Sequence, residues 1–314
     1  MHCELVVPGL FATGATARFA ALELLLARGR RHASRAQNLE GWLQETFELG
    51  EGPFPAGALT LLAHGGDPAG ASWVRADPVH LRVMRDHVVV VPAEAFELAA
   101  PDANALCEAL NAHFVDTDFR PLEPRRWCAK LAEAIEGGNP LDAAGRQVDL
   151  PSRVAPLLNE AQMVLHAHPV NEAREARGEP TVNSLWLWGA GPATSARCAW
   201  QSVAADDPAV LGAARLAGAR HRTLPRSAHD WLKRLPEEGR HLAVLDMLRL
   251  QPKNVLLEEL EKRWFEPLLA ALRAGRVGMV TLHVPDGAEA LSFETIRGDL
   301  RRFWRVARAL ARFT

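Results

Sequence analysis

The amino-acid sequence predicts an α/β fold in which a mostly parallel sheet is flanked by helices. In the second half of the chain, apolar runs of strand length alternate with helical patterns of about ten residues or more, which is the order of parallel α/β proteins. Apolar residues make up 48% and charged residues 24% of the 314 residues, as in ordinary globular proteins. This length accommodates either two domains or one large α/β domain.

The N-terminal half starts with a strand at residues 4–7, because Pro8 and Gly9 stop the apolar run there. Apolar spacing predicts helices at 15–27, 38–49 and 103–114, and strands at 72–76, 87–91 and 125–130. The arginines of residues 28–35 are interpreted as a solvated helix end, with an anion site as the alternative. The loop cluster at 137–140 marks a boundary, so we predict an N-terminal α/β part at 1–140 and a C-terminal α/β part at 141–314, with one composite domain as the alternative.

The C-terminal half carries the clearest alternation of helices and strands. Helical spacing covers residues 154–167, 172–178, 208–217, 228–235, 254–274 and 298–313. Strand-like apolar runs lie between them, at 184–188, 197–203, 221–224, 241–248 and 277–284. Because the two kinds of element alternate, the sheet is expected to be largely parallel and to carry helices on both faces.

Charge and cysteine content exclude several classes of function. The formal net charge of −2 gives no general attraction to nucleic acid or anionic lipid, so we expect neither as a partner. The four cysteines are far apart and form no C-x-x-C pair, as in a protein with reduced thiols. The N-terminus lacks the basic and apolar regions of a secretory signal, and no apolar stretch approaches the roughly eighteen residues that cross a bilayer. We therefore expect a cytoplasmic protein.

Polar side chains concentrate in residues 160–191 and give the first set of ligand-binding candidates. These are His166, His168, Asn171, Arg174 and Asn183. His166 and His168 are two apart, so at a helix end they point to different sides and cannot chelate one ion. For each histidine the alternative is a structural role, as a helix cap or within a buried hydrogen-bond network.

The remaining candidates of this segment also have two interpretations. Asn171 is placed to cap the amino end of the helix at 172–178. The guanidinium group of Arg174 could bind an anion through two hydrogen bonds, or it could pair with a nearby glutamate. Asn183 precedes a strand, and the Gly-Ala-Gly run at 189–191 after that strand is typical of a tight strand-to-helix turn whose amides hold an anion.

A second set of candidates is Arg75, Asp77 and His80, where two strands meet a proline turn. Arg75 and Asp77 are two apart in an extended run and can face the same side, which suits a partly buried ion pair. Contact with a ligand is the second interpretation of this set.

Two stretches of the sequence carry a family resemblance. The run 168–171 (His-Pro-Val-Asn), with Arg174 and Arg177 after it and Asn183 before an apolar run that ends at 189–191, resembles a segment of archaeal-type, cofactor-independent phosphoglycerate mutases, which belong to the alkaline-phosphatase superfamily. With the further runs 71–81 and 86–91, most of the chain resembles the bacterial proteins labelled regulatory protein of the RpfE type. The resemblance implies an alkaline-phosphatase-like fold of reduced size.

The same resemblance indicates what is missing for the chemistry of the mutases. Phosphoryl transfer of that type needs a serine or threonine nucleophile and two divalent metals held by aspartates and histidines. The family's first metal ligand corresponds here to Pro8, and the nucleophile region offers Thr60, which has the position of a packing residue. We therefore predict a regulatory or ligand-binding protein on a degenerate mutase-like scaffold, without a metal or other cofactor, whose partner is a small anionic ligand or a protein.

Two other functions stay open. One is an active phosphoglycerate mutase or phosphatase, for which the metal contacts would be Asp67, Asp246, His283 and Asp286. The other is a protein-interaction module that uses the basic closing helix at 298–313, although most such charge runs are solvated faces.

Overall fold

The computed structural model describes residues 1–15, 17–68, 71–85, 87–131, 137–145, 155–249, 254–287 and 289–313. The chain forms two compact units. The first unit combines residues 1–50 with 195–314, and the second unit holds residues 51–194. Residues 137–140, where the sequence analysis placed a boundary, lie inside the second unit, and Pro140 begins a short helix there. Glycine and proline mark where the chain turns, which need not be where its contacts divide.

The first unit is built on a seven-stranded sheet in the order β2-β12-β11-β1-β10-β8-β9. The five strands from β11 to β9 are parallel, and the antiparallel β12 and β2 complete one edge. Their bounds are β1 (His2–Val6), β2 (Arg30–Ser34), β8 (Ser202–Ala204), β9 (Arg220–Arg222), β10 (Arg240–Val244), β11 (Met279–Asp286) and β12 (Glu289–Ile296). The predicted fold class, α/β with a mostly parallel sheet flanked by helices, is therefore confirmed.

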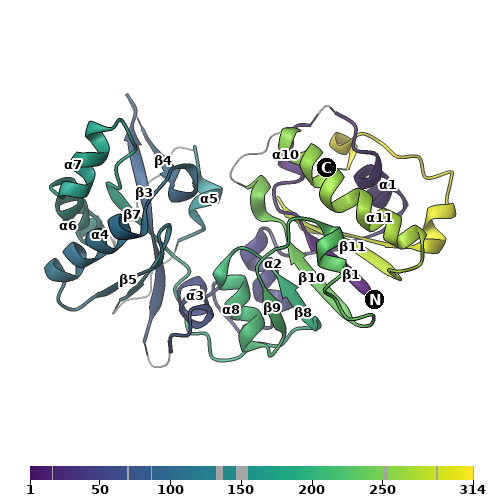
Figure 1. The fold of residues 1–314 in the computed structure, drawn as a ribbon, viewed down its shortest axis with the longest axis horizontal. Coiled ribbons are helices and arrows are strands. Elements are labelled where there is room, and N and C mark those ends of the chain that lie inside the picture. The colour runs from purple at the N-terminus through teal and green to yellow at the C-terminus, as the bar shows by residue number, and fades with distance from the viewer. Residues whose placement is uncertain are drawn as a thin grey trace. The chain divides into compact units, whose positions relative to one another are not determined.

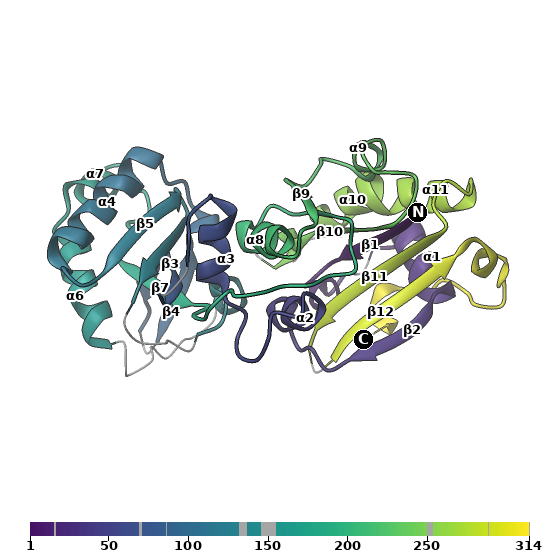
Figure 2. The same cartoon turned by 90° about the horizontal axis from the view of Figure 1, so that it is seen from below.

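Helices cover both faces of this sheet (Figures 1 and 2). Their bounds are α1 (Ala20–Arg28), α2 (Leu39–Thr46), α8 (Pro208–Leu216), α9 (Ala228–Leu232), α10 (Asn254–Leu260), the π-helical η4 (Glu261–Phe265) and α11 (Glu266–Arg273). Cys3 and Leu5 of β1 point into a core shared with α1, α10 and α11. His2 and Glu4 alternate with them and face the opposite side. Trp42 of α2 packs over His283 on that side, with ring centroids 4.9 Å apart.

The second unit is built on an antiparallel sheet of five strands. The strands are β3 (Trp73–Val83), β4 (Val88–Pro92), β5 (Asp118–Glu123), β6 (Arg126–Lys130) and β7 (Ser184–Trp188), and β3 pairs with β4, β6 and β7. The helices are α3 (Ala56–Ala63), α4 (Ala100–His113), α5 (Pro140–Ala143), α6 (Ala155–His166) and α7 (Pro169–Ala176). Residues of α4 and α6 share one core with the sheet, and α3 packs through Ala58 and Leu61 in a separate cluster. Gly57 lets α3 approach β3 closely, because a Cβ there would lie 2.5 Å from the Val74 backbone.

Two basic segments differ from their predicted structure. The arginines of residues 28–35 do not simply end a helix, because Arg30–Ser34 form the edge strand β2. The closing helix predicted at 298–313 is absent: this segment holds the short 3₁₀ helices η5 (Arg297–Arg301) and η6 (Leu310–Arg312), joined by turns and coil. A helix needs an apolar face to bury, and here Phe303 and Trp304 stay exposed.

Within the described ranges, none of the helices combines the length and the apolar character that crossing a membrane requires.

Candidate functional site

The predicted ligand-binding residues all belong to the second unit. Arg75, Asp77 and His80 lie on β3, His166 ends α6, and Asn171 and Arg174 lie on α7, while His168 directly precedes α7 and Asn183 directly precedes β7. Register places Arg75 of β3 opposite Trp188 of β7, and Asp77 opposite Trp186. The remaining candidates lie around the other end of β7, where the chain arrives from α7. The structure therefore separates them into a buried ionic group at one end of β7 and a second group at the other end, in which Asn171 and Arg174 are also buried.

Arg75 and Asp77 form the ion pair that their spacing predicts. Asp77 Oδ1 accepts from Arg75 Nε at 2.9 Å and from Nη2 at 2.7 Å, and both residues are almost fully buried. The other carboxylate oxygen, Oδ2, accepts from Trp188 Nε1 at 2.7 Å, and the guanidinium lies 5.3 Å from the Trp188 ring. Burial raises the pKa of Asp77, while Arg75 and the indole oppose that rise. Thr60 is fully buried beside this pair, where its hydroxyl accepts from Arg75 Nη1 at 3.4 Å.

Asn171 and Arg174 hold α7 to the rest of the second unit. Asn171 Nδ2 donates to the carbonyls of Leu165 and Val182, at 2.8 and 2.7 Å, and Oδ1 accepts from Val182 N at 2.9 Å. The buried Arg174 donates to two carbonyls, Pro180 O from Nε at 2.8 Å and Glu97 O from Nη2 at 2.7 Å. Both side chains therefore make hydrogen bonds to backbone groups of the second unit, which is a structural role.

The cap of α7 corrects one expectation. The helix begins at Pro169, not after Asn171, and His168 is its N-cap, with Nδ1 accepting from Val170 N at 3.2 Å. Proline at the first helical position needs no hydrogen-bond partner for its nitrogen, so the helix starts three residues earlier than the Asn171 signal suggested. His80 Nδ1 donates to Thr181 O at 2.9 Å, which ties β3 to the segment before β7.

The Gly-Ala-Gly run after β7 also differs from its expected role. Gly189 has a φ of 63°, as a tight turn requires, and its carbonyl accepts from Gly57 N at 3.1 Å. The chain then continues as coil and bends rather than as a helix, so there is no helix N-terminus at which an anion could bind.

His166 and Asn183 line a groove between α6 and the outer end of the β3–β4 hairpin. We call it the α6 groove; its volume is about 510 Å³, and it is lined by Leu81, Val83, Val88, Asn159, Gln162, Met163, His166 and Asn183. Asn159, Gln162 and His166 recur at intervals of three and four, which places them on one face of α6. Asn183 is fixed there, because its carboxamide exchanges two hydrogen bonds with the Leu81 backbone, at 2.7 and 2.9 Å.

The α6 groove combines an apolar wall with hydrogen-bonding side chains. Val83 and Met163 expose 79% and 74% of their surfaces, although both are apolar. Gln162 Nε2 donates to Ser184 Oγ at 3.2 Å, so the amide is oriented. This lining suits a ligand with an apolar body and a polar or anionic group near His166.

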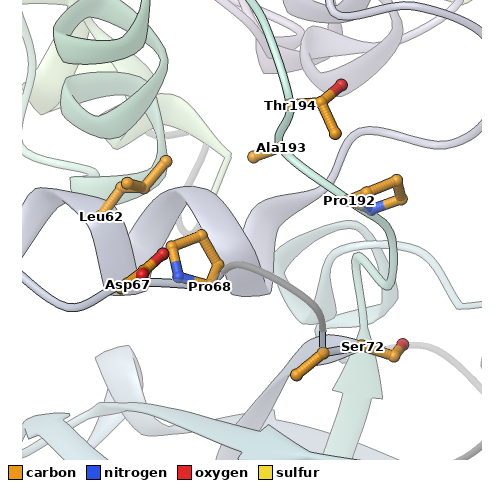
Figure 3. Close-up of a pocket in the computed structure, with 8 residues that line it drawn as sticks. Leu62, Asp67, Pro68, Ser72, Pro192, Ala193 and Thr194 are labelled. Atoms are coloured by element: carbon orange, nitrogen blue, oxygen red, sulfur yellow. The ribbon is translucent and has the colours of Figure 1, made fainter.

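A second pocket of about 590 Å³ lies at the end of α3 (Figure 3). It is lined by Leu62, Asp67, Pro68, Ala71, Ser72, Pro192, Ala193 and Thr194. Figure 3 shows Asp67 and Pro68 near Leu62 of α3, with Ala193 and Thr194 on a separate segment. Asp67, one of the suggested metal contacts, thus belongs to the second unit, whereas Asp246, His283 and Asp286 belong to the first.

In the first unit, two of the other suggested metal contacts, Asp286 and His283, have structural partners. Asp286 Oδ1 accepts from Gly9 N at 2.6 Å and Oδ2 from Phe11 N at 3.0 Å, which fixes the loop after β1. His283 Nε2 donates to Glu4 Oε2 at 3.0 Å, and Nδ1 bonds the Ser292 hydroxyl at 2.7 Å. Within the described ranges, no three histidine, cysteine or acidic side chains are arranged to hold a metal ion.

Glu4 is the centre of a buried ionic cluster that the sequence analysis missed. Its Oε1 accepts from Arg240 Nε at 2.7 Å and lies 3.5 Å from His2 Nδ1, while Oε2 accepts from His283. Burial opposes ionisation, but the hydrogen bonds from His283 and Arg240 outweigh it and lower the pKa of Glu4 to about 2. The available signal was one acidic residue, Glu4, among the apolar residues of β1.

Comparison with known proteins gives a likeness of fold. No family model and no curated protein matches this sequence. Among solved structures, the chain is similar to the PH0037 protein from Pyrococcus horikoshii, with a TM-score of 0.55 and 14% identity over 94% of this chain and 87% of that chain. It is also similar to a cofactor-independent phosphoglycerate mutase from Thermoplasma acidophilum DSM 1728, with a TM-score of 0.46 and 17% identity over 95% of this chain and 90% of that chain. At these identities the likeness concerns the fold, and the Pyrococcus protein has the higher TM-score.

Proposed function

We propose that this protein is a regulatory, ligand-binding protein on a phosphoglycerate mutase-like scaffold and that it does not perform two-metal phosphoryl transfer. The sequence resemblance and the α/β fold support the scaffold. The observation that carries the proposal is the engagement of Asp286 and His283, whose side chains bond the protein itself.

Two-metal catalysis would need these side chains to point their lone pairs at cations. Asp286 holds two backbone amides of the loop after β1, so a metal would have to release that loop. His283 lies between Glu4 and Ser292, and Glu4 already neutralises the charge of Arg240. Pro8, which the sequence resemblance aligns with the family's first aspartate, has no side-chain ligand atom.

The α6 groove is the ligand site that we propose. His166 lies in the groove beside Asn159 and Gln162 of the same helix, with Asn183 across from them. The His166 imidazole would donate a hydrogen bond to a carboxylate or phosphate, while Leu81, Val88 and Met163 would contact an apolar body. The class of ligand is therefore a small amphipathic anion.

The first test is metal content together with activity. Purified full-length protein incubated with Mn²⁺ is expected to retain metal well below one ion per chain and to show neither phosphoglycerate mutase nor phosphatase turnover. Stoichiometric metal, with turnover that a chelator abolishes, would overturn the proposal.

The second test locates the ligand site. A panel of small carboxylates and phosphates with apolar substituents is screened by thermal shift, and hits are repeated with His166→Ala and with Ser72→Ala, which changes the other pocket. We expect loss of at least about tenfold in affinity for His166→Ala and none for Ser72→Ala, since a charged hydrogen bond contributes roughly 1.5 kcal/mol or more. If Ser72→Ala weakens the binding of the hits and His166→Ala does not, the ligand site is the pocket of Figure 3.

A further inference from the structure

The two basic segments of the sequence lie together in the first unit. Arg305 Nη1 donates to the carbonyl of Gly29 at 2.9 Å, and Arg28 donates to that of Leu300. Arg18 Nη2 reaches the carbonyl of Ala307 at 3.4 Å. The C-terminal segment therefore runs beside the end of α1 and the start of β2, although about 270 residues separate them in the chain.

This arrangement concentrates positive charge in a chain of net charge −2. Residues 28–35 contain four arginines and residues 301–312 contain five, and neither stretch contains an aspartate or glutamate. Arg302 pairs with Asp299 at 2.8 Å. The other arginines of 301–312, together with Arg30, Arg31 and Arg35, have no ion pair recorded within the described ranges and are exposed. Such a field attracts an acidic partner.

The same region presents an open sheet edge. β2 is the last strand of the seven-stranded sheet, and its ladder is with β12 (Figure 2). All five residues of β2 are exposed. An edge strand offers backbone N–H and C=O groups to another extended chain. The opposite edge strand, β9, is three residues long and packs near α8.

Arginines on an edge strand can simply protect it from aggregation. The C-terminal segment argues against protection alone, because it exposes apolar side chains next to the start of β2. Phe303, Trp304 and Val306 are 78%, 66% and 67% exposed, and the two aromatic rings pack edge to face with centroids 5.3 Å apart. Exposed aromatic residues among arginines are typical of binding surfaces.

We propose that this basic edge, formed by β2 and residues 301–312, binds an extended acidic segment of a protein partner. The segment adds to β2 as a further strand, its carboxylates pair with the arginines, and an apolar side chain contacts Phe303 or Trp304. The open backbone edge decides between classes of partner, since nucleic acid or anionic lipid would use the arginines but leave the strand's hydrogen-bonding groups unpaired. This proposal is independent of the α6 groove.

The experiment uses the full-length protein and a fluorescein-labelled peptide of eight residues that alternate glutamate and valine. Fluorescence anisotropy at low salt measures its affinity, and hydrogen exchange measures protection of the β2 amides. Control peptides replace glutamate by lysine, or replace two valines by proline, which cannot donate to a strand ladder. We expect the lysine peptide not to bind, the proline peptide to bind at least about tenfold more weakly, and residues 30–34 to gain protection.

Protein variants test the location. Arg30→Glu with Arg31→Glu should weaken binding at least about tenfold, whereas Arg220→Glu with Arg222→Glu, the same charge change on the opposite edge, should leave it within about twofold. Trp304→Ala, at an exposed turn position, tests the same surface if the β2 variant does not fold, and it is expected to weaken binding several-fold. Equal affinity for the proline peptide without β2 protection would overturn strand addition. Tighter binding of a single-stranded oligonucleotide or of phosphatidylserine vesicles would overturn the protein partner.

Discussion

Each unit of the molecule buries a carboxylate, and the two are stabilised differently. Glu4 of the first unit contacts Arg240, His283 and His2, and its pKa falls to about 2. Asp77 of the second unit is paired with one arginine and one indole, and its pKa rises. Both side chains are nearly inaccessible to solvent, at 1% and 2% exposure.

The difference lies in how many cationic and donor groups compensate for lost water. Burial opposes ionisation at both sites and is the largest influence on both pKa values. At Glu4, two hydrogen bonds from basic side chains and the charges of His283 and His2 outweigh it, whereas at Asp77 the contacts with Arg75 and Trp188 and the charge of Arg126 do not. The first unit therefore stabilises the ionised form of its buried carboxylate more fully than the second unit stabilises the carboxylate of the Arg75–Asp77 pair.

Removal of the Glu4 carboxylate should have the largest effect on stability. Glu4→Ala leaves Arg240, His283 and His2 without their common partner, and we expect a loss of about 3–5 kcal/mol in the free energy of unfolding of the first unit. Urea unfolding followed by the indole NMR signals separates the units, because Trp231 is buried in the first and Trp127 in the second.

The matched control is Glu294→Ala on β12. Glu294 faces the same side of the sheet as Glu4, but its side chain is 40% exposed, so we expect a loss below about 1 kcal/mol. Equal effects of the two substitutions would show that the buried cluster adds nothing beyond a surface ion pair, and the contrast between the units would fail.

Sequence distance explains why one carboxylate was predicted and the other was missed. Arg75 and Asp77 are two residues apart, and the period of a strand places them on one face. The partners Arg240 and His283 lie 236 and 279 residues from Glu4 and meet it only through the pairing of β1 with β10 and β11. Strand order is a property of the fold, and local spacing does not contain it.

The same reasoning applies to the fold and to the candidate site. Alternation of helices and strands was sufficient to predict the parallel sheet of the first unit, but not that residues 51–194 form a separate antiparallel unit within that chain. In the polar segment, Asn171 bonds the carbonyl of Val182, which follows the loop after α7, and Arg174 bonds the carbonyl of Glu97, which is 77 residues away in the sequence. Of that segment's candidates, His166 and Asn183 line a groove, because α6 and β7 bring them to the same end of β3.

Acidification should destabilise the first unit more than the second. Glu4 has a folded-state pKa of about 2 against a usual 4.5, so its contribution of about 3 kcal/mol is complete above pH 4.5 and is lost as the pH falls towards 2. The lowered pKa values of His2 and His241, caused mainly by burial, act in the same direction as the pH falls below 6.5. Asp77 has a raised pKa, so its effect on stability is most favourable below its ordinary value and declines as the pH rises.

Urea unfolding at about pH 3 and about pH 6 measures this difference with the same two indole signals. The urea concentration at the unfolding midpoint reported by Trp231 should be lower at about pH 3 than at about pH 6. The midpoint reported by Trp127 should decrease less, or increase. Glu4→Gln should reduce the acid sensitivity of the first unit, because it has no proton to gain. If both midpoints fall equally, general charge repulsion controls acid unfolding and the two carboxylates do not.

Substitution of Glu94 should have a smaller effect on stability, and it should stabilise the second unit where loss of the Glu4 carboxylate destabilises the first. It follows β4 in the 3₁₀ helix η2 (Ala93–Ala95), and its Oε2 is buried without a hydrogen-bond partner among the described residues. Burial first, and the charge of Asp77 next, raise the pKa of Glu94. Glu94→Gln removes a charge that this environment disfavours, so we expect the free energy of unfolding of the second unit to increase by about 1 kcal/mol near neutral pH.

This gain in stability should disappear in acid, where Glu94 is itself protonated. The control is Glu97→Gln, at a side chain that is 96% exposed, and its free energy of unfolding should stay within about 0.5 kcal/mol of the parent. A loss of stability at neutral pH would instead mean that the charge of Glu94 balances Arg126 and Arg75, and that the second unit also depends on an ionised carboxylate.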